Sequence, residues 1–163
     1  MNLTLLKQVL ILSVILGAIL GVLTLIPFVG NIAFFVLMCL ASALIIILMV
    51  KCDLLEVLSV KEGVTLGAVI GFISFIAFAI IYLPVVALLG KVFKLYSLYG
   101  ISLIMSVGSL GVIVMLTIFT AVLSAVINAF TAFLTFYGID LYNNLKRNDE
   151  KKQNFNIDDE FKL

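Results

Sequence analysis

The chain has 163 residues, of which 64% are hydrophobic and 12% are charged, and its formal net charge is +1 at pH 7. A soluble domain is about 45–50% apolar, so these side chains exceed what one aqueous core can enclose, and a bilayer is the remaining solvent. The near-zero net charge gives no reason to expect nucleic acid as a partner. The composition therefore predicts an all-α integral membrane protein with a single domain.

Three long uncharged runs, the first divided by a Pro- and Gly-containing turn at residues 27–31, provide four segments of about the length that a helix needs to cross a bilayer, near 20 apolar residues. The first segment could instead be a secretory signal, but residues 27–31 offer no Ala-x-Ala-like cleavage site, so we expect an uncleaved helix. We expect a four-span transmembrane helical bundle within residues 1–142, with spans at about 9–26, 32–50, 64–89 and 112–138.

The last uncharged run, residues 101–138, is too long for one crossing. Its 38 residues would make a helix of about 57 Å, whereas the hydrocarbon core is about 30 Å thick. Either two spans or one span with an extension would fit the run. The only candidate turn, at Gly108, leaves a first piece that is too short. We therefore expect one span from about Val112, preceded by an interfacial or re-entrant segment.

Residues 143–163 are polar, and we expect them to form a flexible cytoplasmic tail. Phe155, Ile157, Phe161 and Leu163 interrupt the acidic end of this tail. Residues 153–163 are therefore a candidate motif for docking a cytosolic partner, and a simply solvated tail is the alternative.

Lysine and arginine predict how the chain is oriented. With four spans, eight basic residues share one side: Lys7, Lys51, Lys61 and the five that follow Asp140. Only Lys91 and Lys94 fall on the other side. Because basic residues are in excess on the cytoplasmic side, we expect both termini in the cytoplasm. Abundant Lys, Asn, Ile and Phe, with Arg147 as the single arginine, favour a low-GC genome and a bacterial inner membrane.

Glycines recur every four residues in two segments and predict close helix contacts. On a helix such residues share a face, and a bare ridge lets another backbone approach. Residues 16–26 also match residues 66–76 at five of eleven positions with a constant offset of 50. This match indicates two parallel helical hairpins from a duplication, with chance similarity as the alternative. The expected packing residues are Gly17, Gly21, Gly63, Gly67 and Gly71, where the first and third spans should cross.

Polar residues of the last span follow one helical face, at spacings of three and four. The stripe consists of Thr117, Thr120, Ser124, Asn128, Thr131 and Thr135. These side chains could line a narrow polar pathway, or they could hydrogen-bond across packed helices. We favour packing, and Asn128 should face protein because its amide is costly in lipid.

The sequence offers no candidate catalytic, cofactor-binding or metal-binding residue. There is no histidine, which removes the commonest general base and the commonest zinc ligand. No charged residue lies inside a predicted span, although proton-coupled pumps and most ion-coupled transporters use such residues. Cys39 and Cys52 read as free thiols. We therefore expect a non-enzymatic protein without a cofactor or metal.

Three features of the first half of the chain occur together: a glycine-rich first helix, the turn Ile26-Pro27-Phe28, and Lys61-Glu62-Gly63 opening a Gly-xxx-Gly-xxx-Gly helix. In these features the chain resembles uncharacterised small prokaryotic four-helix membrane proteins. The resemblance implies a four-helix membrane fold and brings no activity and no site residues.

Two functions follow from these patterns. The first is a small membrane subunit or scaffold that forms a homo-oligomer or binds another membrane protein. The alternative is a channel-like or facilitator-type transporter subunit that uses the polar stripe. A closed seam at Ser124, Asn128 and Thr131 favours the first, and a water-filled cavity lined by them favours the second.

Overall fold

A computed structural model describes residues 3–26, 28–52, 60–93 and 110–160. Its helices are α1 (Leu3–Leu23), α2 (Val29–Cys39), α3 (Ala41–Lys51), α4 (Val60–Phe93) and α6 (Leu110–Glu160). No strand occurs in these ranges. The prediction of an all-α fold is confirmed. The segment expected to be interfacial or re-entrant before the last span lies largely at 94–109, outside the described residues.

Three of the helices, α1, α4 and α6, are each long and apolar enough to cross a membrane. The helices α2 and α3 reach that length only as a pair, and the pair is bent by 72°. By length and composition the structure thus has three helices that could cross a membrane, or four candidate spans if the bent pair counts as one. The second predicted span, residues 32–50, is therefore not one straight helix but two short helices that meet at Leu40.

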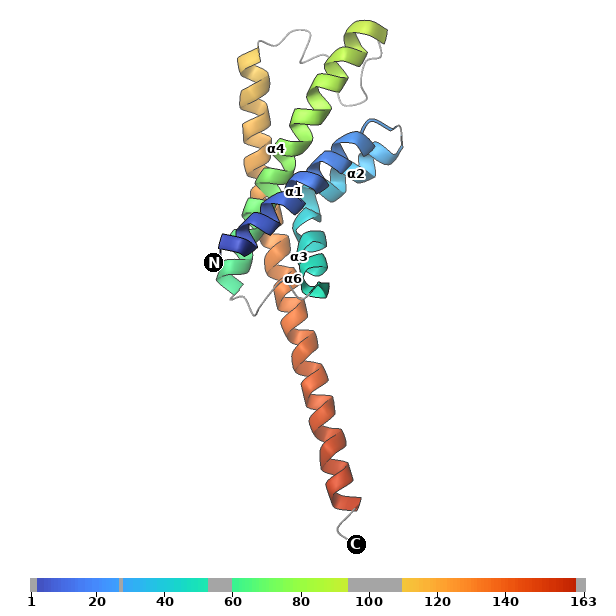
Figure 1. The fold of residues 1–163 in the computed structure, drawn as a ribbon, viewed down its shortest axis with the longest axis vertical. Coiled ribbons are helices and arrows are strands. Elements are labelled where there is room, and N and C mark those ends of the chain that lie inside the picture. Colours follow the sequence, from blue (N-terminus) through green and yellow to red (C-terminus); the bar gives the residue numbers. More distant parts are fainter. Residues whose placement is uncertain (1–2, 27, 53–59, 94–109, 161–163) are drawn as a thin grey trace.

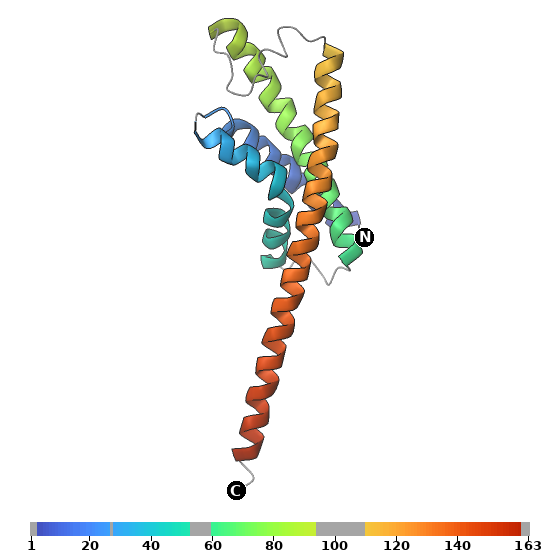
Figure 2. The ribbon, with the colours of Figure 1, turned by 180° about the vertical axis from the view of Figure 1, so that it is seen from behind.

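The helices form an elongated bundle in which α4 and α6 cross at its centre (Figure 1). Helix α1 crosses α4 obliquely, and α2 returns beside α1. After the bend, α3 turns to run alongside α6, as the view from behind also shows (Figure 2). The second members of the two expected hairpins therefore differ, because α2 and α3 are bent while α6 is continuous.

Two helices are longer than their predicted spans. Helix α4 continues through Pro84, although a proline inside a helix usually kinks or ends it, and reaches Phe93. Helix α6 extends well beyond the rest of the bundle (Figure 1), as a helix that reaches Glu160. The polar segment from residue 143, which we expected to be a flexible tail, continues α6 as a helix as far as Glu160, since it contains no Gly or Pro to end the helix.

The core consists of two apolar clusters arranged along the length of α4. One gathers Leu20, Leu37 and an aromatic group on α4, in which the rings of Phe78 and Tyr82 stack with centroids 5.0 Å apart. The other gathers buried side chains of α1, α3 and α4. Helix α6 contributes only alanines to the buried part of either cluster, Ala121 to the first and Ala132 to the second. Small residues on α6 therefore let it lie close to its neighbours.

The glycines of α1 lie against α4, but they do not meet the glycines of α4. A Cβ at Gly17 would run into the backbone oxygen of Ser74, and one at Gly21 would lie 3.3 Å from the backbone oxygen of Phe78. Both contacts fall beyond Gly71 along α4. The two backbones thus approach closely at a point where only the α1 side supplies glycines.

The glycines of α4 instead face α6. A Cβ at Gly71 would lie 2.6 Å from the backbone oxygen of Ser124, and one at Gly67 would lie 2.6 Å from that of Asn128. A Cβ at Gly63 would meet the ring of Phe136. The expected crossing of glycine on glycine between the first and third spans is therefore wrong. Helix α6 occupies the glycine ridge of α4, which leaves the next stretch of α4 to α1.

Candidate functional site

The break between α2 and α3 exposes backbone groups that a continuous helix would pair. In an α-helix each carbonyl accepts a hydrogen bond from the N–H four residues on. Leu40 has φ −122° and ψ −3°, outside helical values, so the ladder is interrupted there. The carbonyls of Leu37, Met38 and Cys39 and the N–H of Ser42 then need other partners, because unpaired backbone groups are costly in an apolar interior.

Asn128 on α6 supplies most of these partners. Its Oδ1 accepts a hydrogen bond from the Ser42 N–H at 2.8 Å. Its Nδ2 lies 3.3 Å from the carbonyl oxygen of Leu37 and 3.0 Å from that of Met38. The same nitrogen lies 3.0 Å from the carbonyl oxygen of Ser124 on its own helix. Asn128 is fully buried. Its single amide pairs with the backbone N–H of Ser42 and with backbone carbonyls of α2, which the break leaves without helical partners.

Two neighbouring hydroxyls complete the arrangement around Asn128. Thr131 Oγ1 donates to the carbonyl of Cys39 at 2.8 Å, and it also lies 3.1 Å from the carbonyl oxygen of Ile127. Ser42 Oγ donates to the backbone oxygen of Asn128 at 2.8 Å. The bent pair is therefore fixed to α6 through three side chains, which we call the polar seam: Ser42, Asn128 and Thr131.

Ser124 connects the polar seam to α4. Its hydroxyl donates to the carbonyl oxygen of Gly71 at 3.2 Å and lies 3.3 Å from Nδ2 of Asn128. The contact depends on the absence of a side chain at Gly71, since a Cβ there would lie 2.7 Å from Asn128 Cβ. Gly71 and the Ser124 hydroxyl thus meet where α4, α6 and the bent pair come together.

The outer members of the predicted stripe do not join the seam. Thr117, Thr120 and Thr135 each donate to the carbonyl four residues earlier on α6, at 2.8 Å. The stripe therefore divides into two parts. Ser124, Asn128 and Thr131 bind other helices, while the remaining threonines direct their hydroxyls at their own backbone.

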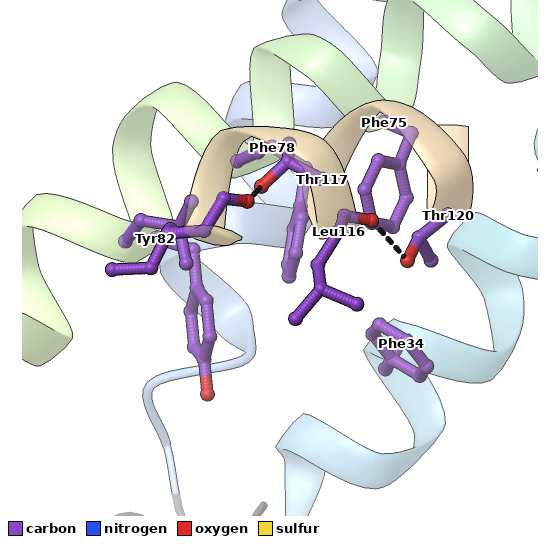
Figure 3. A pocket seen from close by; sticks show the side chains of 10 residues that line it. Phe34, Phe75, Phe78, Tyr82, Leu116, Thr117 and Thr120 are labelled. Carbon is purple, nitrogen blue, oxygen red and sulfur yellow. Dashed lines mark hydrogen bonds between the residues drawn. The ribbon is translucent and has the colours of Figure 1, made fainter. Parts of the chain in front are cut away.

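An apolar cavity of about 260 Å³ lies on the Thr117 side of the seam, between α2, α4 and α6. Phe34, Phe75, Phe78 and Tyr82 are among the side chains that line it (Figure 3). The hydroxyls of Thr117 and Thr120 border it, but both donate to carbonyls of α6, as the dashed lines show (Figure 3). Its chemistry suits a hydrocarbon chain better than water or an ion.

Sequence reasoning found Asn128 but missed Ser42. A signal was present, because Ser42 is the only hydroxyl between residues 32 and 50. The break itself gave none, since neither Gly nor Pro lies near Leu40. Within the described ranges, no group of three or more His, Cys, Asp or Glu side chains is placed to hold a metal ion.

Comparisons with known proteins add no family to this description. No protein-family model matches the chain, and no curated protein and no solved structure matches it.

Proposed function

We propose that this protein is a non-enzymatic subunit or scaffold of the bacterial inner membrane, which associates with itself or with another membrane protein. The observation that carries the proposal is the contrast between the two faces of α6. On the face toward the bundle, the polar seam binds the bent pair to α6, whereas the opposite face is apolar and exposed along the helix. In the apolar stretch of α6 only 11% of the residues are buried, whereas 39% are buried in that of α4.

The uncovered face continues past the length that lipid can cover. Phe119, Val126 and Phe130 are 63–69% exposed and lie on one side of α6. Leu141 and Leu145 follow on the same side, are more than half exposed, and come after the charged Asp140. The part of α6 from Leu110 to Arg147 would be about 57 Å long, nearly twice the thickness of the hydrocarbon core. Apolar side chains beyond that thickness favour a protein partner.

Self-association through this face is tested by cysteine cross-linking. In a variant without the native cysteines (Cys39→Ala, Cys52→Ser), Leu141→Cys should form a disulfide-linked dimer under mild oxidation in the membrane. Asn143→Cys is the control, because two residues on a helix turn the side chain by about 200°. Equal cross-linking of both variants would indicate random collision. A monomer in both, by cross-linking and by native mass spectrometry, would leave association with a different membrane protein as the form to test by co-purification.

The alternative, a channel-like or facilitator-type transporter subunit, has less support. A polar pathway needs side chains that offer hydrogen bonds to a solute. In the stripe, Ser124, Asn128 and Thr131 are engaged with other helices, and the outer threonines with their own backbone. Solute or ion flux into proteoliposomes that disappears in Asn128→Leu but persists in Asn143→Leu would favour the alternative.

We also propose that both termini are cytoplasmic, on the basis of the excess of lysine and arginine on one side. The termini share a side whether the α1–α2–α3 segment crosses the bilayer and returns or enters and leaves by the same face. A reporter that is active only in the cytosol should be active when fused after Leu163. Activity there of a periplasmic reporter would require an odd number of crossings.

A further inference from the structure

We propose that the α1–α2 hairpin is re-entrant: it enters the bilayer from the side that holds Lys7 and Lys51, and its tip at Phe28 ends among the lipid acyl chains without reaching the opposite surface. This proposal concerns how the chain meets lipid and is independent of whether the protein associates with a partner.

The hairpin reaches only part of the way across the bilayer. Helix α3 runs alongside α6 (Figures 1 and 2), so we take its direction as close to the membrane normal. Its 11 residues rise about 16 Å. Helix α2 also has 11 residues, but its 72° bend leaves it a rise of only about 5 Å along that direction. The hairpin tip therefore lies about 21 Å from the level of Lys51, within a hydrocarbon core about 30 Å thick.

A comparison with α6 leads to the same result. The polar seam ties the bend to Asn128. From Asn128, α6 rises a further 18 residues, about 27 Å, to reach Leu110. From the bend, α2 rises only about 5 Å at 72°. The tip stops about 20 Å short of the end of α6, and Figure 1 likewise shows it well below the far ends of α4 and α6.

The tip of the hairpin carries no charge and exposes large apolar side chains. No charged residue occurs from Gln8 to Val50. Phe28 is 92% exposed, and Ile32 is 67% exposed. An aqueous turn of this kind would present a large aromatic ring to water, whereas the same ring is stabilised by burial in hydrocarbon. Phe28 also has φ +71°, an uncommon conformation for a bulky residue, so a glycine would serve better if only a turn were needed.

Several backbone N–H groups of the turn are paired within the hairpin. A turn can lie in lipid only if its polar backbone groups are paired internally. The N–H groups of Thr24, Leu25 and Ile26 donate to carbonyls of α1 at 2.9–3.1 Å, and that of Gly30 donates to the carbonyl of Ile26 at 2.9 Å. Thr24 Oγ1 donates to the Leu20 carbonyl at 2.7 Å. Proline, at position 27, has no N–H to pair.

The test uses three single cysteines in the Cys39→Ala, Cys52→Ser background: Phe28→Cys at the tip, Leu110→Cys at the far end of α6, and Asn144→Cys on the projecting part of α6. A membrane-impermeant maleimide is applied to vesicles of each orientation. Leu110→Cys should be labelled from one side only and Asn144→Cys from the other. Phe28→Cys should be labelled from neither side, although a solvent-exposed turn would react at the rate of Leu110→Cys.

A second measurement shows whether lipid is what shields the tip. Phe28→Cys is labelled with bimane in detergent and returned to bilayers whose lipids carry bromine at different depths. Bromine in the acyl chains should quench the tip strongly, and bromine near the headgroups should quench it less. Labelling of Phe28→Cys from the side that labels Leu110→Cys, or absence of acyl-chain quenching, would overturn the proposal.

Discussion

Ser42 and Asn128 exchange two hydrogen bonds across 86 positions of sequence. The Ser42 N–H donates to Oδ1 of Asn128 at 2.8 Å, and the Ser42 hydroxyl donates to the backbone oxygen of Asn128 at 2.8 Å. Neither bond belongs to a helix ladder. Together they allow α2 and α3 to part at Leu40 without leaving the Ser42 N–H unpaired in an apolar interior.

Replacement of Asn128 by leucine should therefore destabilise the protein more than one lost side-chain bond would. Asn128→Leu leaves the Ser42 N–H and the carbonyls of Leu37 and Met38 without their partners, and each buried unpaired group costs about 1–3 kcal/mol. We expect a loss of at least about 2 kcal/mol in the free energy of unfolding, measured by SDS titration followed by far-UV circular dichroism. Asn143→Leu, the same change at an exposed position of α6, should be near neutral. Equal effects of the two variants would contradict the capping role.

Two buried serines should respond differently to the same truncation. Ser42→Ala removes the bond from its hydroxyl to the Asn128 backbone and should destabilise by about 1 kcal/mol. Ser74 is also fully buried, but its hydroxyl has no hydrogen-bond partner within the described residues. Ser74→Ala should therefore be neutral or stabilising, because it removes an unsatisfied polar group. The same SDS titration measures both, and a larger loss for Ser74→Ala than for Ser42→Ala would refute the prediction.

Substitution by alanine should lower the stability of the protein at Gly17 but not at Gly138. Gly17→Ala would place its Cβ against the backbone oxygen of Ser74, whereas a Cβ at Gly138 meets nothing within 4 Å. We expect Gly17→Ala to destabilise by about 1–3 kcal/mol, as overpacking does. Gly138→Ala should be neutral or should stabilise by up to about 1 kcal/mol through helix propensity. Thermal unfolding in detergent provides the comparison, and a neutral Gly17→Ala would show that α1 and α4 do not lie this close.

The packing of α1 on α4 also has a direct geometric test. The Cβ built at Gly21 lies 3.5 Å from Cβ of Ile81, within the range of disulfides. Gly21→Cys with Ile81→Cys, in the background without native cysteines, should close an intramolecular disulfide on oxidation. Gly21→Cys with Gly71→Cys should not, because Gly71 faces α6. Non-reducing mass spectrometry of proteolytic fragments identifies the bond, and efficient closure of the second pair would restore the glycine-on-glycine crossing.

The amino-acid sequence by itself determined the helical class and the apolar character of the spans. Long uncharged runs leave no alternative to helices that satisfy their own backbones in lipid. The spacing of Ser124, Asn128 and Thr131 was enough to place them on one face, since that depends only on the helical period. The cost of burying an amide was enough to predict that Asn128 would face protein.

Only the tertiary structure decided which surfaces meet and where a helix breaks. The glycine ridges at Gly17 and Gly71 look equivalent in sequence, yet α6 occupies the second, because its small residues fit a bare ridge as well as another glycine helix would. The break at Leu40 has no local cause in its own segment. It is stable because Asn128 and Thr131, about 90 residues away, provide the hydrogen bonds that the interrupted helix loses. Such a long-range exchange of partners leaves no periodic trace in the chain.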